Sequence, residues 1–413
     1  MSEISKLLAY THDSLKDEPS IFDFMEESPP ESFAQKEDYA VITKELWTSG
    51  QRQASSIHEV SYRACFKPQL PNYFIQLFSK PGDTVYDPFS GRGTTAIEAA
   101  LCSRNVVAND VNPLSIFLTK PRLQIPTLQE VEVRLGAIKF DRDIGADIDL
   151  SMFYHQDTLN ELLCLKNYLA ERSASGKADY IDDWIRMVAT NRLTGHSKNF
   201  FSVYTLPPNQ ACSQKKQIEF NLKRNQVPEY KDVKAIILNK STSLKKDITD
   251  ETRKSLFEVG KKAIFLNEDA ANTKQIQDES ISLVVTSPPF LDVIDYASDN
   301  WLRAWFNGID MEKVQKKITV TNSVEKWESF MRSVFTELFR IVKKDGYVAF
   351  EVGEVRGGSV KLEENIVPIG KQAGFEIIAV LVNEQKFSKT SNIWGVTNNK
   401  KGTNTNRIVL FIK

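Results

Sequence analysis

The chain has 413 residues, with 53 basic and 54 acidic side chains and a formal net charge of −1. Hydrophobic residues make up 41% of it, enough for a substantial core over two or three domains. Apolar runs are short, so we expect no membrane-spanning helix, and the first residues lack the features of a secretion signal. The four cysteines are far apart and form no C-x-x-C pair, so we expect neither a disulfide framework nor a metal site. The composition therefore predicts a soluble cytoplasmic protein.

Charge is unevenly distributed along the chain. Residues 1–45 hold eleven acids against four lysines and few apolar repeats, which is typical of a partly ordered acidic arm. Residues 192–246 hold eleven bases against three acids. This excess indicates a segment that faces a polyanion, although a solvated lysine-rich surface has the same composition.

A strand, a glycine turn, a helix and a second strand follow one another between residues 84 and 110. The pattern predicts a buried strand over 84–87, a helix of small residues over 94–102 and a strand over 105–110. It resumes after residue 262, with strands expected over 263–266, 282–286, 347–352, 375–382 and 408–412, and an amphipathic helix over 327–342. This order predicts a doubly wound, mostly parallel α/β sheet with a long helical insert.

The turn after the first strand contains a G-x-G-x-x-A pattern. Gly91 and Gly93 allow a ligand to approach the backbone, and a helix N-terminus favours electron-rich groups. Asp110, at the end of the next strand, is placed to accept both ribose hydroxyls of a nucleoside. Asp87 is unfavourable beside a pyrophosphate but suits a cationic amino-acid group, so S-adenosylmethionine is favoured over NAD. No P-loop motif is present.

The sequence Thr-Ser-Pro-Pro-Phe at residues 286–290 follows a buried strand, at the edge where α/β folds bind ligands. The Ser287 hydroxyl and the Pro288 carbonyl can each accept one N–H of a nucleobase amine, whose lone pair then turns toward a methyl sulfonium. Pro288 and Pro289 make the turn rigid and remove competing backbone donors. Phe290 offers an aromatic face, and stacking contributes ~1–3 kcal/mol per base.

Together these segments resemble the amino-group DNA methyltransferases, which methylate cytosine N4 or adenine N6 with S-adenosylmethionine. Residues 87–94 resemble the family's cofactor motif and residues 286–290 its catalytic motif. The resemblance implies a class I, Rossmann-like methyltransferase fold and a target base flipped out of double-stranded DNA. The cofactor contacts expected from the motifs and the resemblance are Phe66 and Pro68 over the methionine part, Asp269 near the adenine, and Asp87, Phe89, Gly91, Gly93, Thr94 and Asp110.

Serine at the first catalytic position is usual in the cytosine-N4 subgroup, whereas Asp or Asn is usual in the adenine-N6 subgroup. We therefore expect a cytosine-N4 enzyme that protects DNA from a partner restriction endonuclease. An adenine-N6 or RNA amino-group methyltransferase and a non-catalytic nucleic-acid-binding subunit remain alternatives, and an NAD-dependent dehydrogenase is a more distant one. Carbon-5 methylation is disfavoured because no cysteine follows a proline.

We divide the chain into an acidic arm (1–45), a cofactor-binding catalytic domain (46–120 and 263–413) and an inserted target-recognition region (121–262). Bases of the insert are expected to hold phosphates and to read base edges, although some of them equally suit loop positions near the active cleft. The candidate DNA contacts are Arg192, His196, Lys198, Lys215, Lys216, Lys223 and Arg224. Through DNA the protein would associate with the nucleoid.

Overall fold

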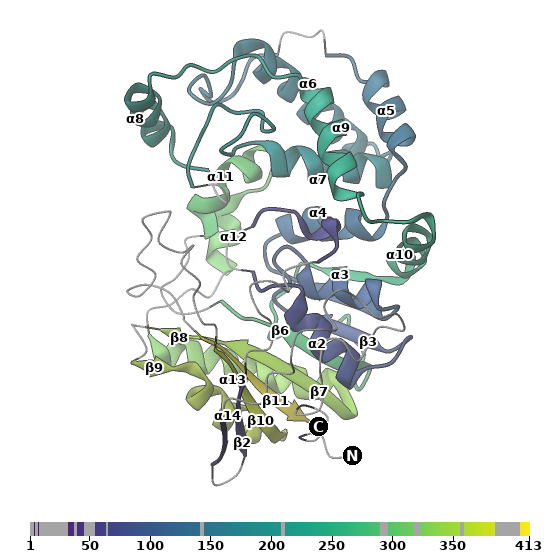
Figure 1. The fold of residues 1–413 in the computed structure, drawn as a ribbon, viewed down its shortest axis with the longest axis vertical. Coiled ribbons are helices and arrows are strands. Elements are labelled where there is room, and N and C mark those ends of the chain that lie inside the picture. Colours follow the sequence, from purple (N-terminus) through teal and green to yellow (C-terminus); the bar gives the residue numbers. More distant parts are fainter. Residues whose placement is uncertain are drawn as a thin grey trace, which may run out of the picture.

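The computed structural model describes residues 4, 7, 32–36, 39–44, 54–62, 65–140, 144–207, 211–289, 296–317, 323–355, 359–384 and 405–413. Its main sheet has nine strands in the order β1-β2-β10-β11-β7-β6-β3-β4-β5 (Figure 1). The strands are β1 (Ser32–Gln35), β2 (Ala40–Lys44), β3 (Thr84–Asp87), β4 (Asn105–Asn109), β5 (Ile264–Leu266), β6 (Ile281–Thr286), β7 (Val342–Val352), β10 (Glu376–Glu384) and β11 (Thr405–Ile412). A separate pair consists of β8 (Glu354–Val355) and β9 (Val360–Lys361).

The predicted doubly wound, mostly parallel sheet is confirmed. Strands β5, β4, β3, β6 and β7 run parallel, and β11 is antiparallel to both β7 and β10. At the far edge β2 pairs in parallel with β10, and β1 pairs antiparallel with β2. Two short strands from the acidic N-terminal segment therefore extend the sheet, which its composition did not indicate.

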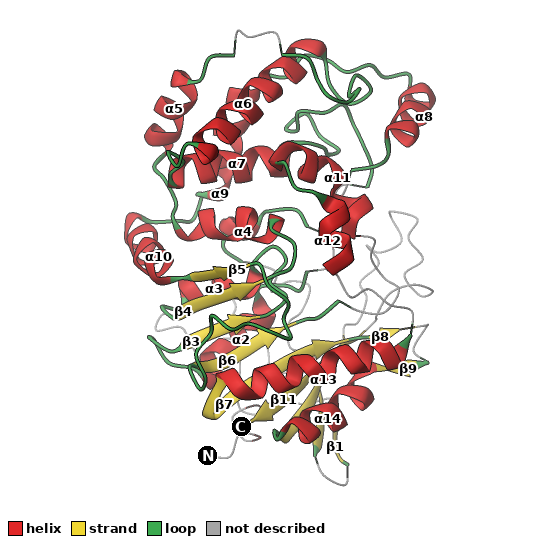
Figure 2. Cartoon of the chain, turned by 180° about the vertical axis from the view of Figure 1, so that it is seen from behind, coloured by secondary structure: helices red, strands yellow, loops and turns green. Residues whose placement is uncertain are grey.

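Alternate residues of the central strands enter two different cores. Val85 and Leu283 belong to the core on one face, whereas Tyr86 and Val284 belong to the core on the other. This two-residue period explains why the strands are apolar throughout, since both faces are covered by helices (Figure 2). The covering helices are α2 (Gln69–Phe78) and α3 (Thr94–Leu101) on the first face, and α13 (Val324–Ile341) and α14 (Leu362–Ala373) on the second.

Helices of the insert form a layer beyond the β5 edge of the sheet (Figure 2). They share the first core, to which α7 contributes the fully buried Trp184. The last insert helix, α10, contacts α3 and β4 and is the crossover that connects β4 to β5. The helices outside the two sheet faces are α4 (Leu114–Thr119), α5 (Leu128–Ala137), α6 (Gln156–Ala174), α7 (Tyr180–Arg192), α8 (Gln214–Arg224), α9 (Val233–Leu244), α10 (Asp250–Lys262), α11 (Tyr296–Asn307) and α12 (Met311–Lys317), with 3-10 turns at Ser56–His58 and Lys120–Leu123. In the described part of the chain, no helix is long and apolar enough to span a membrane.

Candidate active site

The turn after β3 has a backbone conformation that requires glycine. Gly91 and Gly93 have φ values of +52° and +78°, in the left-handed region that L side chains rarely adopt. A Cβ on Gly93 would also lie 2.3 Å from the side chain of Thr119. The Gly93 amide donates to the Ser90 carbonyl (2.6 Å), and α3 begins at Thr94. The turn therefore presents bare backbone and a helix N-terminus at the carboxyl edge of the sheet.

Asp110 follows β4 and lies against this turn. Its carboxylate accepts the amides of Gly91 (2.8 Å) and Asn112 (2.9 Å). Burial raises the pKa of this carboxyl to about 6. The acid predicted to hold a ribose is therefore fixed between the glycine turn and the neighbouring strand end, where its remaining lone pairs can accept hydroxyls.

Asn109, the last residue of β4, connects the ends of β3 and β5. Its amide nitrogen donates to the carbonyls of Pro88 (3.3 Å) and Glu268 (3.0 Å), and its amide oxygen accepts the Glu268 amide (2.9 Å). The next residue, Asp269, is exposed and accepts the amide of Ala271 (2.9 Å). Asp269 therefore lies at the same sheet edge as the glycine turn.

Asp87 links the glycine turn directly to the Ser-Pro-Pro turn. Its side chain is 2% exposed, and Oδ1 accepts both the Thr286 hydroxyl (2.6 Å) and the Phe89 amide (3.1 Å). Burial raises the pKa of Asp87 to about 7, and the nearby Asp110 charge acts in the same direction. A second link runs from the Thr95 hydroxyl to the Val285 carbonyl (3.0 Å). The two turns predicted to carry cofactor and catalytic chemistry thus adjoin at one edge.

Ser287 is hydrogen-bonded to a buried carboxyl that sequence reasoning missed. Glu351, near the end of β7, is 5% exposed and interacts with the Ser287 hydroxyl. Asn406 of β11 donates to the same carboxyl. Burial raises the pKa of Glu351 to about 7. An acid inside the apolar run of residues 347–352 is the sequence signal that could have identified it.

Helix α13 supports both turns from the second face of the sheet. The Trp327 indole donates to the Pro289 carbonyl (3.0 Å), and the Phe330 ring lies edge-on to Phe89, with centroids 6.3 Å apart. Pro288 is buried, whereas Ser287 remains partly accessible. Phe290, the predicted stacking residue, lies outside the described residues.

A segment between the 3-10 turn at Ser56–His58 and α2 crosses the glycine turn. The Tyr62 ring lies 3.5 Å from the position of a Cβ on Gly91. Arg92 fastens the segment by donating to the carbonyls of His58 (3.3 Å) and Val60 (3.0 Å). Farther along, Phe66 and Pro68 are half-buried. Arg92 therefore fixes residues 58–60 at the glycine turn, and Phe66 and Pro68 lie farther along the chain, just before α2.

Arg122 is a second residue that the sequence did not reveal. It is fully buried, and its guanidinium donates to the backbone carbonyls of Leu118 (2.8 Å), Ile57 (3.3 Å) and Arg92. Burial lowers its pKa to about 9, and the neighbouring Arg92 charge contributes. Its hydrogen bonds to the Ile57 and Arg92 carbonyls therefore connect the segment before α2 to the glycine turn.

The predicted DNA contacts fall into two groups. Arg192 is 8% exposed, and its guanidinium lies 3.9 Å from the centroid of the Phe200 ring, so in this arrangement it stabilises the insert rather than facing solvent. Burial lowers the pKa of Arg192 to about 10. The other six are exposed, and Arg224 stacks on Tyr204 at 4.1 Å. These exposed bases are His196 and Lys198 in the loop after α7, and Lys215, Lys216, Lys223 and Arg224 on α8.

This strand order, with one antiparallel strand between β7 and β10 and a glycine turn after the central β3, is that of the class I methyltransferases. The family model described as DNA methylase matches residues 8–121. The type II methyltransferase M.BsoBI of Geobacillus stearothermophilus is 22% identical over 328 residues, covering 73% of this chain and 64% of that protein. The type II methyltransferase M.MjaII of Methanocaldococcus jannaschii is 28% identical over 105 residues, covering 24% and 20%.

The chain is therefore similar to DNA methyltransferases, most extensively in residues 8–121 and along the match to M.BsoBI. It spans less than two thirds of the length of these relatives, 64% of M.BsoBI and 20% of M.MjaII. Among solved structures, a TehB-like SAM-dependent methyltransferase from Corynebacterium glutamicum is similar at 7% identity and a TM-score of 0.29, with coverage of 83% and 86%. The rRNA methyltransferase AviRa from Streptomyces viridochromogenes is similar at 11% identity and a TM-score of 0.32, with coverage of 87% and 90%. Because such scores do not establish a common fold, the fold is defined by the strand order itself.

Proposed function

We propose that this protein transfers a methyl group from S-adenosylmethionine to the exocyclic N4 amine of cytosine in double-stranded DNA. One observation carries the proposal. Ser287, hydrogen-bonded to the buried Glu351, directly follows Thr286, whose hydroxyl is bonded to Asp87 at the cofactor turn. A group that can orient an amine therefore adjoins a turn that can hold a nucleoside.

The residues at the sheet edge fit S-adenosylmethionine. The glycine turn leaves backbone free where a side chain would collide, and Asp110 offers a carboxylate for the ribose hydroxyls. Asp87 supplies negative charge for the cationic methionine part, and Asp269 stands at the β5 end for the adenine. Phe66 and Pro68 belong to the segment that would cover the methionine. When bound, the cofactor supplies an electrophilic methyl carbon on a positively charged sulfur.

The chain's own residues would prepare the amine and remove its proton. Because the Ser287 hydroxyl can donate to Glu351, its oxygen lone pair is free to accept one N–H of the target amine, while the Pro288 carbonyl accepts the other. Held by Asp110 and the glycine turn, the cofactor would supply the methyl group to the oriented nitrogen, and its sulfur would keep the electron pair of the carbon–sulfur bond. The surplus proton then leaves nitrogen for the Ser287 oxygen as the hydroxyl proton passes to Glu351, whose pKa of about 7 suits a proton acceptor near neutrality.

Cytosine N4 is the favoured target because serine at position 287 is usual in that subgroup. Adenine N6, or an amino group in RNA, is the second candidate on the same fold. Digesting DNA treated with the protein and S-adenosylmethionine, then identifying the modified nucleoside by mass spectrometry, distinguishes them. N4-methylcytosine is expected, and N6-methyladenine alone would overturn the choice of base.

The expected partner is duplex DNA with the target base flipped out, which costs a few kcal/mol that base stacking and phosphate contacts must offset. The exposed bases of α8 and of the loop after α7 supply candidate phosphate contacts. Such binding would hold the protein on the nucleoid. Protection of DNA from a cognate restriction endonuclease is the role expected of a type II enzyme. Restriction-resistant plasmid recovered from cells that express the protein would support it.

A further inference from the structure

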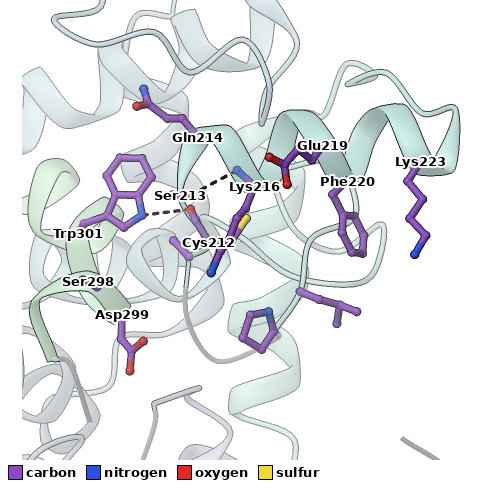
Figure 3. Close-up of a pocket in the computed structure, with 13 residues that line it drawn as sticks. Cys212, Ser213, Gln214, Lys216, Glu219, Phe220, Lys223, Ser298, Asp299 and Trp301 are labelled. Atoms are coloured by element: carbon purple, nitrogen blue, oxygen red, sulfur yellow. Dashed lines mark hydrogen bonds between the residues drawn. The ribbon is translucent and has the colours of Figure 1, made fainter. Parts of the chain in front are cut away.

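A cavity of about 840 Å³ lies between α8 and the start of α11, away from the Ser287 turn (Figure 3). Its volume is within the range of small-ligand sites. Hydrogen bonds join the two walls: the Trp301 indole donates to the Cys212 carbonyl (3.2 Å), and the Ala211 amide donates to the Asp299 carbonyl (3.3 Å). The insert and the helix that follows the catalytic turn thus enclose one preformed space.

One face of α8 forms a wall of this cavity. Lys216, Glu219, Phe220 and Lys223 follow i, i+3, i+4, i+7 spacing, and all four line it. Figure 3 shows Phe220 and Lys223 projecting from the same side of the helix. The Phe220 ring is stacked on Tyr204, with centroids 5.9 Å apart and planes at 9°. The aromatic face is therefore held in place before any ligand arrives.

The opposite side fixes α8 to the insert. Gln217 is fully buried and donates to the Tyr204 carbonyl (3.2 Å), and Asn221 donates to the Met152 carbonyl (2.8 Å). The helix consequently presents its cavity face in one orientation. Lys215 lies on the same helix but does not line the cavity, so it provides a matched control.

The lining chemistry is that of a nucleotide site. Two ammonium groups can hold a phosphate, an aromatic ring can stack on a base, and the exposed carboxylate of Glu219 can accept a base amino group. Because Glu219 offsets part of the lysine charge, the cavity discriminates by the placement of its groups as well as by charge. A base with its phosphate satisfies all of them, whereas a free anion satisfies only the lysines.

The catalytic turn is close enough for both sites to serve one duplex. Eight residues lie between Pro289 and Ser298 at the cavity, and the nine steps from Cα to Cα can span at most ~32 Å. One helical turn of DNA is about 34–36 Å. This upper bound is compatible with a duplex that contacts both the Ser287 turn and the cavity.

We propose that this cavity binds one nucleotide of the DNA strand outside the target base, with the phosphate on Lys216 and Lys223 and the base against Phe220. The inference rests on the proposed function, since it takes DNA as the substrate. It adds a second nucleotide site in the insert that positions the duplex relative to Ser287.

The test is a double-mutant cycle on affinity for a fluorescein-labelled DNA duplex, measured by anisotropy at several salt concentrations. Phe220→Leu should weaken binding about tenfold with an unchanged salt slope, since the change removes a stacking contact. Lys216→Gln/Lys223→Gln should reduce the salt slope by about 2. Because one nucleotide engages both, the combined loss should be smaller than the product of the separate losses. In the control, Phe220→Leu combined with Lys215→Gln, the loss in affinity should equal the product of the two separate losses.

The proposal is overturned if the fold-losses in DNA affinity multiply fully when Phe220→Leu is combined with the cavity lysines, as they do with Lys215→Gln. It is also overturned if the cavity variants bind DNA with wild-type affinity, which would indicate a partner other than DNA for the cavity. Thermal unfolding of each variant shows whether it is still folded. If Phe220→Leu is unfolded, the test relies on the Lys216→Gln/Lys223→Gln variant, whose side chains are exposed. Nucleoside analysis with the wild-type protein separates the two levels. If the wild-type protein methylates DNA but the cavity variants bind DNA as well as wild type, only the cavity proposal is refuted. If the wild-type protein does not methylate DNA, the proposed function is refuted.

Discussion

Replacing Glu351 with glutamine separates a catalytic carboxylate from a merely structural one. The change Glu351→Gln keeps the length of the side chain but prevents ionisation. Glu351 is 5% exposed, and burial raises its pKa from 4.5 to about 7. At pH 8 the wild-type protein therefore carries a buried negative charge that the variant lacks.

The size and sign of the stability effect follow from that pKa. The difference between 4.5 and about 7 is about 2.5 units, or roughly 3 kcal/mol at 1.36 kcal/mol per unit. Between these two values the folded state holds a proton that the unfolded state has released, so wild-type stability falls as pH rises through this window. We expect Glu351→Gln to raise the free energy of unfolding in urea by up to about 3 kcal/mol at pH 8, and to change it little near pH 4.

Activity should move in the opposite direction. The wild-type single-turnover rate of methyl transfer to DNA should rise with pH to a plateau above about 7, as Glu351 ionises. Glu351→Gln should remove this rise and lower the plateau by ~10²–10⁴-fold, the usual contribution of a positioned proton acceptor. A glutamine amide donating to Ser287 would also engage the lone pair that the target amine needs.

Glu337 on α13 provides a control of opposite sign. Burial favours its neutral form, but hydrogen bonds from Arg340 and Thr273 outweigh burial and lower the pKa of Glu337 to about 2. Glu337→Gln should therefore destabilise the protein at pH 8 and leave the methyl-transfer pH profile unchanged. A Glu351→Gln variant with the wild-type rate and profile, or one less stable than wild type at pH 8, would refute the reasoning.

Three further substitutions test the site, and a fourth, at Gly82, is a control. Ser287→Ala should lower methyl transfer at least ~10²-fold while leaving S-adenosylmethionine affinity by calorimetry within about twofold, and a wild-type rate would remove the catalytic assignment of Ser287. Asp110→Asn should weaken cofactor binding ~10–100-fold, because hydrogen bonds to a charged group contribute ~1.5–3 kcal/mol; unchanged affinity would remove the ribose assignment. Gly82→Ala and Gly93→Ala each place alanine at positive φ, at a cost of about 1–2 kcal/mol. Only Gly93→Ala adds a clash, with Thr119, so it should be clearly the less stable in urea, and equal stabilities would contradict the geometry of the turn.

Local patterns predicted the sheet and the meeting of its two functional turns. Apolar runs bounded by turns identify the strands, and parallel strands bring their carboxyl ends to one edge, which places Asp87, Asp110 and Ser287 together. Glu351 was missed because its role depends on the register of β7 against β6, where Phe350 pairs with Thr286. The acid within an apolar run marks Glu351 as unusual, but no local pattern encodes the register that brings it to Ser287.

Two further features were not predicted because they also depend on tertiary contacts. Arg192 counts as a base in the sequence, but a guanidinium can be buried by stacking on an aromatic ring, here Phe200. The acidic composition of residues 1–45 concealed a short alternating segment near its end, of which Ala40 and Ile42 enter the core. Composition predicts the average exposure of a segment. Whether the segment forms a strand here depends on pairing with the edge strand β10, which composition does not encode.

The central claim is that a single pocket brings the bound methyl group to the amine held by Ser287. A crystal structure of the protein with S-adenosylmethionine tests it most directly. We predict the ribose hydroxyls on Asp110 and the methyl sulfonium facing Ser287, with room for an amine nitrogen about 3 Å from the methyl carbon. A cofactor bound elsewhere, or one whose methyl group points away from Ser287, would contradict the account.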